Sequence, residues 1–490
     1  MASQTEEWQR LFEVTQTAAD IIPTPDAVQS QLIRFKEWTF SYATSGLNDE
    51  SLAALSRYVT SMECVSQYES VLAGEVKNVS ENNAVLHHSC RNPKSTLYQK
   101  LWADLKAFND DLQGDLKTRF NTIVFVGIGG SYLGPQYLVH ALQKAGVEAH
   151  RDVYFLPNLD PNSMADILAK VEYSKTLFVF TTKSGSTRET IENYKVISTY
   201  LSDQGVSEQD QKNQLVAITS TGSFFDDALR FSRVFEIDVA IGGRFSLSSA
   251  VGMVLLMACF GLDVCAQFLE GAHEMDVHAQ SKDLRQNMPL MMAAIGFWQQ
   301  SCKGFSARAI VPYSDALAFF PPFLQQLYCE SLGKATLSDG SPLVAGTGPL
   351  IVGGVGTLLQ HSLFQFFHDN PEGVPVQFIA FRQSNVQDSA GQQISLNQNC
   401  VAQISALIQR PIEQNAAPRP STLLLADRIT PRCLGSLLSL YENATMFEGF
   451  MYGINTFDQP AVELGKQLAN RLKEGQSSDP LLDAFHSLFK

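Results

Sequence analysis

The chain has 490 residues, of which 45% are hydrophobic and 18% are charged, and its formal net charge is −14. This composition excludes a disordered chain, and the length favours two domains over a single core. The acidic balance disfavours nucleic acid and anionic membranes as partners. A small anionic substrate would therefore need a site that is locally cationic.

The N-terminus shows no basic stretch followed by an apolar run, so we expect no signal peptide. The most apolar window, 250–262, is too short to span a bilayer and predicts a buried helix. The eight cysteines form no C-x-x-C pair, which predicts free thiols and a cytoplasmic protein.

Residues 1–100 are predicted to form a helical segment that packs on the larger domain. Strand-like apolar runs then alternate with amphipathic, helix-length segments, which is typical of parallel β-α-β units. The predicted strands are 122–128, 152–156, 176–182, 214–220 and 234–238, and the predicted helices are 133–145, 163–171, 187–201 and 224–231.

A helix-rich connection, 246–300, leads to a second alternating array. Its predicted strands are 307–313, 350–356, 375–381 and 421–427, and its predicted helices are 315–333, 358–369, 395–409, 432–452 and a C-terminal helix at 460–474. The sequence therefore predicts an α/β protein with two doubly wound parallel-sheet domains. We expect these domains at 101–280 and 281–450, followed by a C-terminal helical segment, 451–490.

The segment GIGGSYLG (127–134) lies between a predicted strand and a predicted helix, where open α/β sheets bind ligands. Its glycines permit close approach of a ligand to the backbone, and the next helix begins with free N–H groups. Tyr132 stands where a dinucleotide fingerprint would need glycine, and the chain contains no P-loop. A simple tight turn is the alternative.

The segment TTKSGSTRET (181–190) has a hydroxyl side chain at six of ten positions, between a strand and a helix. Together with Lys183 and Arg188, these groups predict a phosphate site built without a metal. Ordinary helix capping is the alternative, but capping needs only one or two such residues.

Two charged residues, Arg244 and Glu330, lie next to glycine or apolar residues in the sequence. Arg244 follows two glycines after a predicted strand, which favours a ligand contact over a solvated charge. Glu330 has Leu327, Tyr328 and Cys329 beside it, a setting that would partly desolvate a general base. The alternative is an exposed carboxylate paired with Lys334 at i+4.

The histidines and the C-terminal lysine are less informative by themselves. His361 and His368 are seven residues apart on one predicted helix, which is not the i, i+4 spacing of metal ligands, and we expect no metal site. A solvated lysine is the default interpretation of Lys466.

Taken together, six segments resemble, in order, those of the phosphoglucose isomerase family, which has the sugar-isomerase fold. The resemblance covers about residues 120–470 and rests on GIGGSYLGP, KSGSTRET, GGRFSLSSAVG, QQLYCESLGK, GTLLQHSLFQFFH and GINTFDQPAVELGK. The chain departs from the family's motifs beside the chemical groups, at Leu332, Leu358, Leu359 and Pro460.

The resemblance implies interconversion of glucose 6-phosphate and fructose 6-phosphate through a cis-enediol, in glycolysis and gluconeogenesis, without a cofactor. It implies that Glu330 moves the proton, that Arg244 stabilises the enediolate, and that His361 and Lys466 open the sugar ring. The substrate-binding residues that it implies are Gly130, Ser131, Thr182, Lys183, Ser184, Ser186, Thr187, Gln326 and Gln459.

The resemblance also implies a homodimer in which His361 acts across the interface. Three other functions remain open at this point. A regulatory protein of the same fold would bind sugar phosphate without turnover. An amidotransferring enzyme would need an N-terminal cysteine nucleophile or an ammonia source, and the first residues, Met1-Ala-Ser-Gln, offer neither. A dinucleotide oxidoreductase is disfavoured by Tyr132.

Overall fold

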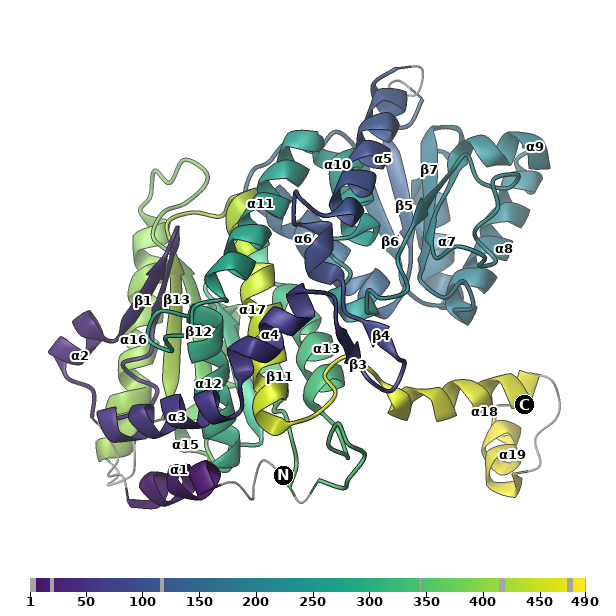
Figure 1. Cartoon of the computed structure of the whole chain (residues 1–490). Coiled ribbons are helices and arrows are strands. Elements are labelled where there is room, and N and C mark those ends of the chain that lie inside the picture. The colour runs from purple at the N-terminus through teal and green to yellow at the C-terminus, as the bar shows by residue number, and fades with distance from the viewer. Residues whose placement is uncertain are drawn as a thin grey trace.

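The computed structural model describes residues 6–17, 22–114, 119–343, 345–413, 419–473 and 479–489. Two separate β-sheets, each flanked by helices, are joined by a group of long central helices (Figure 1). The first sheet is wholly parallel, in the order β6-β5-β7-β8-β9. Its strands are β5 (Thr122–Val126), β6 (Asp152–Leu156), β7 (Thr176–Thr182), β8 (Leu215–Thr219) and β9 (Arg233–Glu236).

The three inner strands of the first sheet, β5, β7 and β8, are buried at every position, which explains why they are predominantly apolar runs. In β5, Ile123 and Phe125 face the large central core, whereas Val124 and Val126 face a smaller outer core. The helices that follow or cover these strands are α5 (Thr96–Gln113), α6 (Leu133–Lys144), α7 (Pro161–Lys170), α8 (Arg188–Asp203) and α9 (Glu208–Gln211).

The prediction of a helix at 224–231 is wrong. This segment forms successive turns, because the Asp226 carboxylate accepts from the Gly222 N–H at 2.7 Å and that of Asp227 accepts from the Leu229 N–H at 2.8 Å. Phe225 and Phe231 pack beside Phe180 in the outer core. The aromatic side chains thus fix the segment without helical backbone.

The second sheet has the order β1-β2-β13-β12-β10-β11. Four of its strands are parallel, as predicted, namely β10 (Ala307–Pro312), β11 (Leu350–Gly353), β12 (Val376–Phe381) and β13 (Ser421–Ala426). The other two come from the N-terminal segment. β1 (Leu32–Phe35) and β2 (Trp38–Ser41) form a hairpin that pairs antiparallel with β13. The prediction that residues 1–100 form a helical segment is therefore wrong for this hairpin.

The rest of the N-terminal segment is helical except for a second hairpin, β3 (Val76–Asn78) with β4 (Asn83–Ala84). Its helical elements are α1 (Glu6–Thr17), α2 (Pro25–Ser30), α3 (Asp49–Ser61), α4 (Cys64–Leu72) and the 3-10 turn η2 (His87–Cys90). Figure 1 shows β3 and β4 near the centre of the molecule, between the two sheets.

Two predicted helices of the second array are divided. A short turn, η7 (Asp315–Leu317), precedes α13 (Phe320–Leu332), whose first turn contains two prolines that cannot donate backbone hydrogen bonds. The predicted helix 358–369 is two short helices, α14 (Gly356–Leu359) and α15 (Phe364–Asp369), with His361 between them. The remaining helix of this array is α16 (Gln392–Glu413).

The central helices are α10 (Ala250–Phe260), α11 (Leu262–His278), α12 (Met288–Ser301) and α17 (Pro431–Tyr452). The window 243–260 is long and apolar enough to cross a membrane, but 94% of it is buried inside the protein, so it is a core segment. All the cysteines except Cys329 are buried, and all eight are free.

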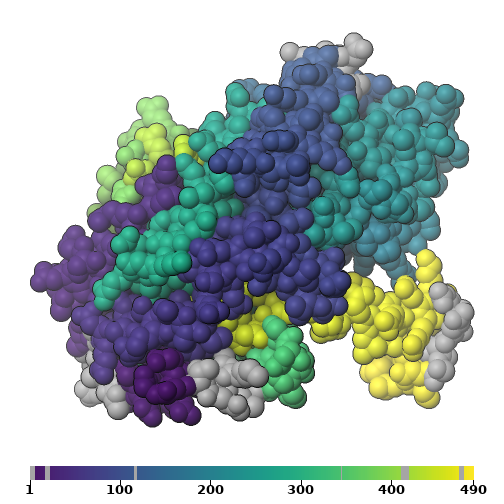
Figure 2. Space-filling view, viewed as in Figure 1, coloured from purple at the N-terminus to yellow at the C-terminus, as the bar shows by residue number. Residues whose placement is uncertain are grey.

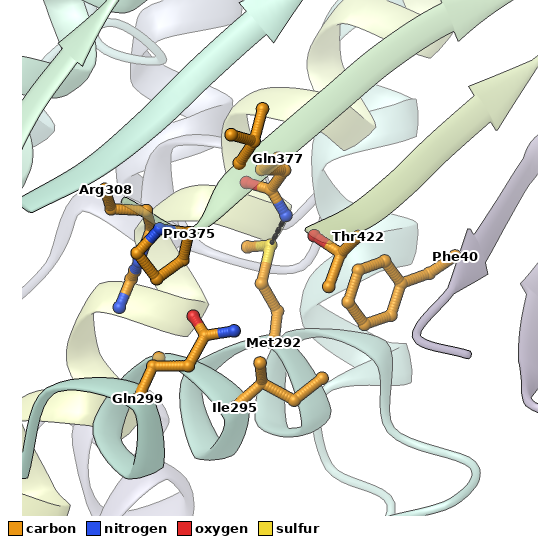
Figure 3. Close-up of a pocket in the computed structure, with 10 residues that line it drawn as sticks. Phe40, Met292, Ile295, Gln299, Arg308, Pro375, Gln377 and Thr422 are labelled. Atoms are coloured by element: carbon orange, nitrogen blue, oxygen red, sulfur yellow. Dashed lines mark hydrogen bonds between the residues drawn. The ribbon is translucent and has the colours of Figure 1, made fainter. Parts of the chain in front are cut away.

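A small cavity lies between α12 and the amino ends of β10, β12 and β13 (Figure 3). Its volume is about 20 Å³, which is room for about one water molecule. Gln377 crosses it, donates to the Met292 sulfur at 3.1 Å and accepts from the Tyr441 hydroxyl at 2.6 Å. We regard it as a packing cavity.

Three buried ionisable side chains connect the end of η2 with α11 and α17. Arg91 donates to the two carboxylate oxygens of Asp276 at 2.6 and 2.8 Å and also contacts Glu442. Burial would raise the pKa of Asp276, but Arg91 and the hydrogen bonds from Ser439 and Asn443 outweigh it and lower that pKa. For Glu442 burial prevails over Arg91 and raises the pKa to about 7.

We expect Glu442→Gln to change how stability depends on pH. The pKa of Glu442 is about 7 in the folded chain and about 4.5 ordinarily. Between these two pH values, the carboxyl group is protonated in the folded chain but ionised in the unfolded chain. This group's contribution to stability therefore falls as pH rises through that window, by up to about 1.4 kcal/mol per pH unit.

The glutamine variant lacks this loss. Its melting temperature relative to the unmodified protein should rise steadily between about pH 5 and pH 7. A difference that stays constant across that range would contradict the assignment.

The C-terminal segment projects from the body as an arm (Figure 2). It contains η8 (Pro460–Val462), α18 (Glu463–Lys473) and α19 (Pro480–Ser487), and neither helix has a buried residue. Lys473 pairs with Glu192 of α8 at 2.8 Å, which ties the arm to the first-sheet half.

Candidate active site

The candidate site is centred on Arg244, in the turn η6 (Gly243–Phe245). Its side chain is 1% exposed, so the alternative of a solvated surface charge is excluded. Nη1 lies 3.3 Å from a carboxylate oxygen of Glu330 and donates to Gln459 Oε1 at 2.7 Å. Nε donates to the Ser331 hydroxyl at 2.7 Å. One cation thus joins the end of α13 to the segment before α18.

Glu330 lies near the C-terminal end of α13, and its side chain is 30% exposed. One oxygen faces Arg244, and the other accepts from Gln326 Nε2 at 3.1 Å. The alternative pairing with Lys334 does not occur, because Lys334 pairs with Asp458 at 2.8 Å. Glu330 is therefore fixed on two sides by polar partners yet open to solvent, as a carboxylate that exchanges protons with a ligand must be.

The glycine turn at 127–131 packs directly against Arg244. A Cβ atom on Gly130 would lie 2.2 Å from the backbone carbonyl of Gly243 and 2.8 Å from the backbone nitrogen of Arg244. Gly129 has a φ of +57°, and a Cβ there would lie 3.2 Å from Gln326 Nε2. The segment is therefore a tight turn, which was the alternative interpretation of its glycines. The same tightness brings its backbone close to Arg244 and Gln326, the two residues that hold Glu330.

The hydroxyl-rich loop lies at the carboxyl end of the adjacent strand, β7. Thr182 and Thr187 share a hydrogen bond of 2.9 Å, and the Ser186 hydroxyl donates to the Ser184 hydroxyl at 2.9 Å. Thr187 occupies the N-cap position of α8 but makes no capping hydrogen bond. Helix capping therefore does not account for these hydroxyls, and the first N–H groups of α8 face the loop unbound by its N-cap.

Lys183 links this loop to Arg244's surroundings. It lines a cavity of about 90 Å³ together with Gln459, Gly243 and residues of the β3–β4 hairpin, among them Glu81. Burial lowers the pKa of Lys183, while Glu81 opposes that change. The N-terminal hairpin, which lacks a recognisable motif, therefore forms one wall beside the site.

His361 lies at the other end of α13 from Glu330. The helix runs antiparallel to β11, because Gly353 adjoins Pro321 and Cys329 adjoins Pro349. Glu330 thus lies beside the start of β11, whereas exposed His361 follows its end. Pro321 and Glu330 are nine positions apart, which separates the two ends by roughly 14 Å along the helix.

Lys466 also stands apart from Glu330. Its side chain is 65% exposed on α18 and pairs with Glu463 at 2.7 Å. Among the described residues, those brought together by contacts are Arg244, Glu330, Gln326, Gln459 and the glycine turn. The hydroxyl-rich loop, Thr182 to Thr187, lies beside this group, because Lys183 lines the same cavity as Gly243 and Gln459. Ser131 lies in the glycine turn.

Sequence reasoning missed part of the surroundings of Arg244. The carbonyls of Thr456 and Asp458 accept from Nη2 at 2.6 and 3.1 Å, and Ser331 accepts from Nε. Asp458 and Ser331 both lie inside segments already singled out, next to Gln459 and Glu330. Adjacency within those segments was the signal that could have identified them.

The chain matches the family model described as phosphoglucose isomerase over residues 41–488. The glucose-6-phosphate isomerase of Chlamydia muridarum is 35% identical over 472 residues, covering 91% of this chain and 89% of that protein. That of Treponema pallidum is 37% identical over 485 residues, covering 92% and 90%. A crystal structure of a glucose-6-phosphate isomerase from Chlamydia trachomatis matches with a TM-score of 0.93, at 33% identity, over 99% of both chains.

Proposed function

This chain belongs to the phosphoglucose isomerase family, and we propose that it interconverts glucose 6-phosphate and fructose 6-phosphate. The observation that carries the proposal is the pairing of partly exposed Glu330 with buried Arg244, beside a hydroxyl-rich loop. The reaction needs a base that reaches two adjacent carbons, a cation for the enediolate and a cradle for the phosphate. The regulatory alternative has no support from the comparisons.

The proposal is tested by mixing the purified protein with fructose 6-phosphate without added metal. Glucose 6-phosphate should form and be detectable by a coupled assay. Absence of product under conditions in which the protein is folded would refute the proposed function.

In the proposed proton transfer, the partly exposed Glu330 carboxylate takes a proton from C1 or C2 and returns it to the other carbon. Gln326 fixes one oxygen of the carboxylate, so its approach to the substrate is set before binding. Arg244 stabilises the negative charge that develops on the enediolate. A cation already fixed by its hydrogen bonds needs no rearrangement during the reaction, and such preorganisation is often the largest catalytic contribution.

The phosphate is assigned to Ser184, Ser186 and Thr187 and the start of α8, with Thr182 and Lys183 flanking it. The uncapped first turn of a helix favours an anion through its N–H groups and its dipole. On the sugar side, Gly130 and Ser131 offer the backbone of the glycine turn, and Gln459 is assigned to orient the substrate.

Replacing Ser184 and Thr187 together with alanine is expected to raise KM by about 100-fold or more. Each hydroxyl removed would cost one hydrogen bond to a charged group, about 1.5–3 kcal/mol. The measurement is a Michaelis curve with fructose 6-phosphate. Ser174→Ala serves as the control, because the Ser174 hydroxyl is exposed and donates to Glu172 at 3.1 Å, outside the loop. An unchanged KM in the double variant would remove the loop from the site.

Ring opening is assigned to His361 and Lys466. Because His361 follows the opposite end of β11 from Glu330, its assignment requires a second subunit, and we propose a homodimer with the histidine supplied by the partner. Lys466 lies seven residues beyond Gln459 on the exposed arm, so its assignment requires the arm to approach the site. We also propose a cytoplasmic location and a role in glycolysis and gluconeogenesis, which free cysteines and the family favour.

A further inference from the structure

Lys334 follows Glu330 by four residues, just after the end of α13, but pairs with a different carboxylate. Its side chain is 9% exposed, and its ammonium group lies 2.8 Å from a carboxylate oxygen of Asp458 and also contacts the Asp458 carbonyl. A buried ammonium is costly unless it is fully paired. Both contacts are with one residue, so Lys334 fixes the backbone and the side chain of Asp458 at once.

Asp458 is held from the other side by the N-terminal hairpin region. The Ser80 hydroxyl donates to the second carboxylate oxygen at 2.5 Å, and Asn455 Nδ2 donates to the same oxygen at 2.9 Å. Asn455 also donates to Asn78 at 3.1 Å. Burial would raise the pKa of Asp458, but the bonds from Lys334 and Ser80 outweigh it and lower that pKa. The carboxylate is thus an ionised junction between three distant chain segments.

The turn that contains Asp458, residues 456–459, is also the one that accepts hydrogen bonds from Arg244. The Asp458 carbonyl accepts from both Lys334 and Arg244, and the neighbouring Thr456 carbonyl and Gln459 side chain complete the contacts of the guanidinium on this side. If the turn at 456–459 moved, Arg244 would lose three of its acceptors together. Its alignment with Glu330 would then no longer be fixed.

We propose that Lys334 and Asp458 are positioning residues, which hold the turn at 456–459 so that Arg244 stays aligned with Glu330. The proposal rests on the proposed function and deepens it. Neither side chain needs to touch the substrate, and the effect of each should pass through Arg244. A displacement of about 1 Å in a catalytic group can cost about 100-fold in rate.

The test is a double-mutant cycle with fructose 6-phosphate. Lys334→Met should lower kcat by about 10- to 100-fold while KM stays within about threefold, and Asp458→Asn should act in the same direction. Arg244→Lys already removes the forked contacts of the guanidinium. In that background, adding Lys334→Met should lower kcat by less than about threefold relative to Arg244→Lys alone. Lys334→Arg, which keeps the charge, should recover part of the rate.

Lys303→Met is the matched control. Lys303 likewise has its ammonium group near a backbone carbonyl, that of Thr15 at 3.5 Å, but it is only half-buried and lies outside the site. Its kcat should equal that of the unmodified protein. Melting temperatures for all variants separate misfolding from misalignment, and Asp458→Asn, which preserves size, provides the test if Lys334→Met does not fold.

The outcomes are distinguishable. An unmodified protein without isomerase activity refutes the proposed function. An active protein whose Lys334→Met and Asp458→Asn variants keep full kcat refutes the positioning role alone. An equal loss from Lys334→Met with Arg244 and with lysine at position 244 also refutes it, because the effect would not pass through Arg244.

Discussion

Replacing Glu330 with glutamine is expected to lower kcat by at least about 10²- to 10⁴-fold, the usual contribution of a positioned acid–base group. The amide preserves the size of the side chain but cannot accept the proton from carbon. The phosphate loop and Arg244 remain, so binding of fructose 6-phosphate, measured by calorimetry, should persist. Full activity in this variant would contradict the assignment of the base.

Glu172→Gln is a suitable control for that experiment. Glu172 is a carboxylate 57% exposed, paired with Lys175 at 2.8 Å and outside the assigned site. Loss of this exposed pair should cost little stability, and both kcat and melting temperature should match those of the unmodified protein. A comparable fall in kcat in this variant would show that the loss is not specific to Glu330.

Replacing Gly130 with alanine is expected to lower kcat/KM by about 100-fold or more. The added Cβ would lie 2.2 Å from the Gly243 carbonyl, a backbone group that cannot rotate away. The glycine turn and the Arg244 turn must therefore separate, which disturbs the substrate-binding backbone and the alignment of Arg244 together. Steady-state kinetics with fructose 6-phosphate, alongside melting temperatures, provide the measurement.

Gly242→Ala is the matched control, because it lies on the same turn as Arg244. Its Cβ would meet only the Phe245 ring, at 3.6 Å, which is an ordinary contact. We expect kcat/KM within about fivefold of the unmodified protein. Similar losses in both variants would show that the turn tolerates no side chain at all, and that the Gly130–Gly243 contact is not the cause of the loss.

The first sheet could be predicted closely because its inner strands, β5, β7 and β8, are buried on both faces. Such strands are uninterrupted apolar runs, and β7 has the predicted bounds of 176–182. The β1–β2 hairpin escaped prediction for a physical reason. Its strands are four residues long, and the turn between them contains Lys36 with a φ of +50° and Glu37, rather than the glycine or asparagine that announces a hairpin.

The candidate site could be predicted only in its parts. Glu330 and Arg244 were identified from their segments, but 86 positions separate them, and no local pattern reveals that they pair. The i+4 spacing favoured a Glu330–Lys334 pair, whereas the folded chain offers Lys334 the carboxylate of Asp458, which is 124 positions away. Contacts of this range are set by the packing of whole domains.

The central claim is that Glu330 carries a proton between C1 and C2 of an open-chain sugar phosphate. Its most direct test is conversion of fructose 6-phosphate in deuterated water, followed by nuclear magnetic resonance of the product. The unmodified protein should form glucose 6-phosphate with deuterium at C2, and the Glu330→Gln variant should incorporate essentially none in the same time. Equal deuterium incorporation by the two proteins would contradict the claim.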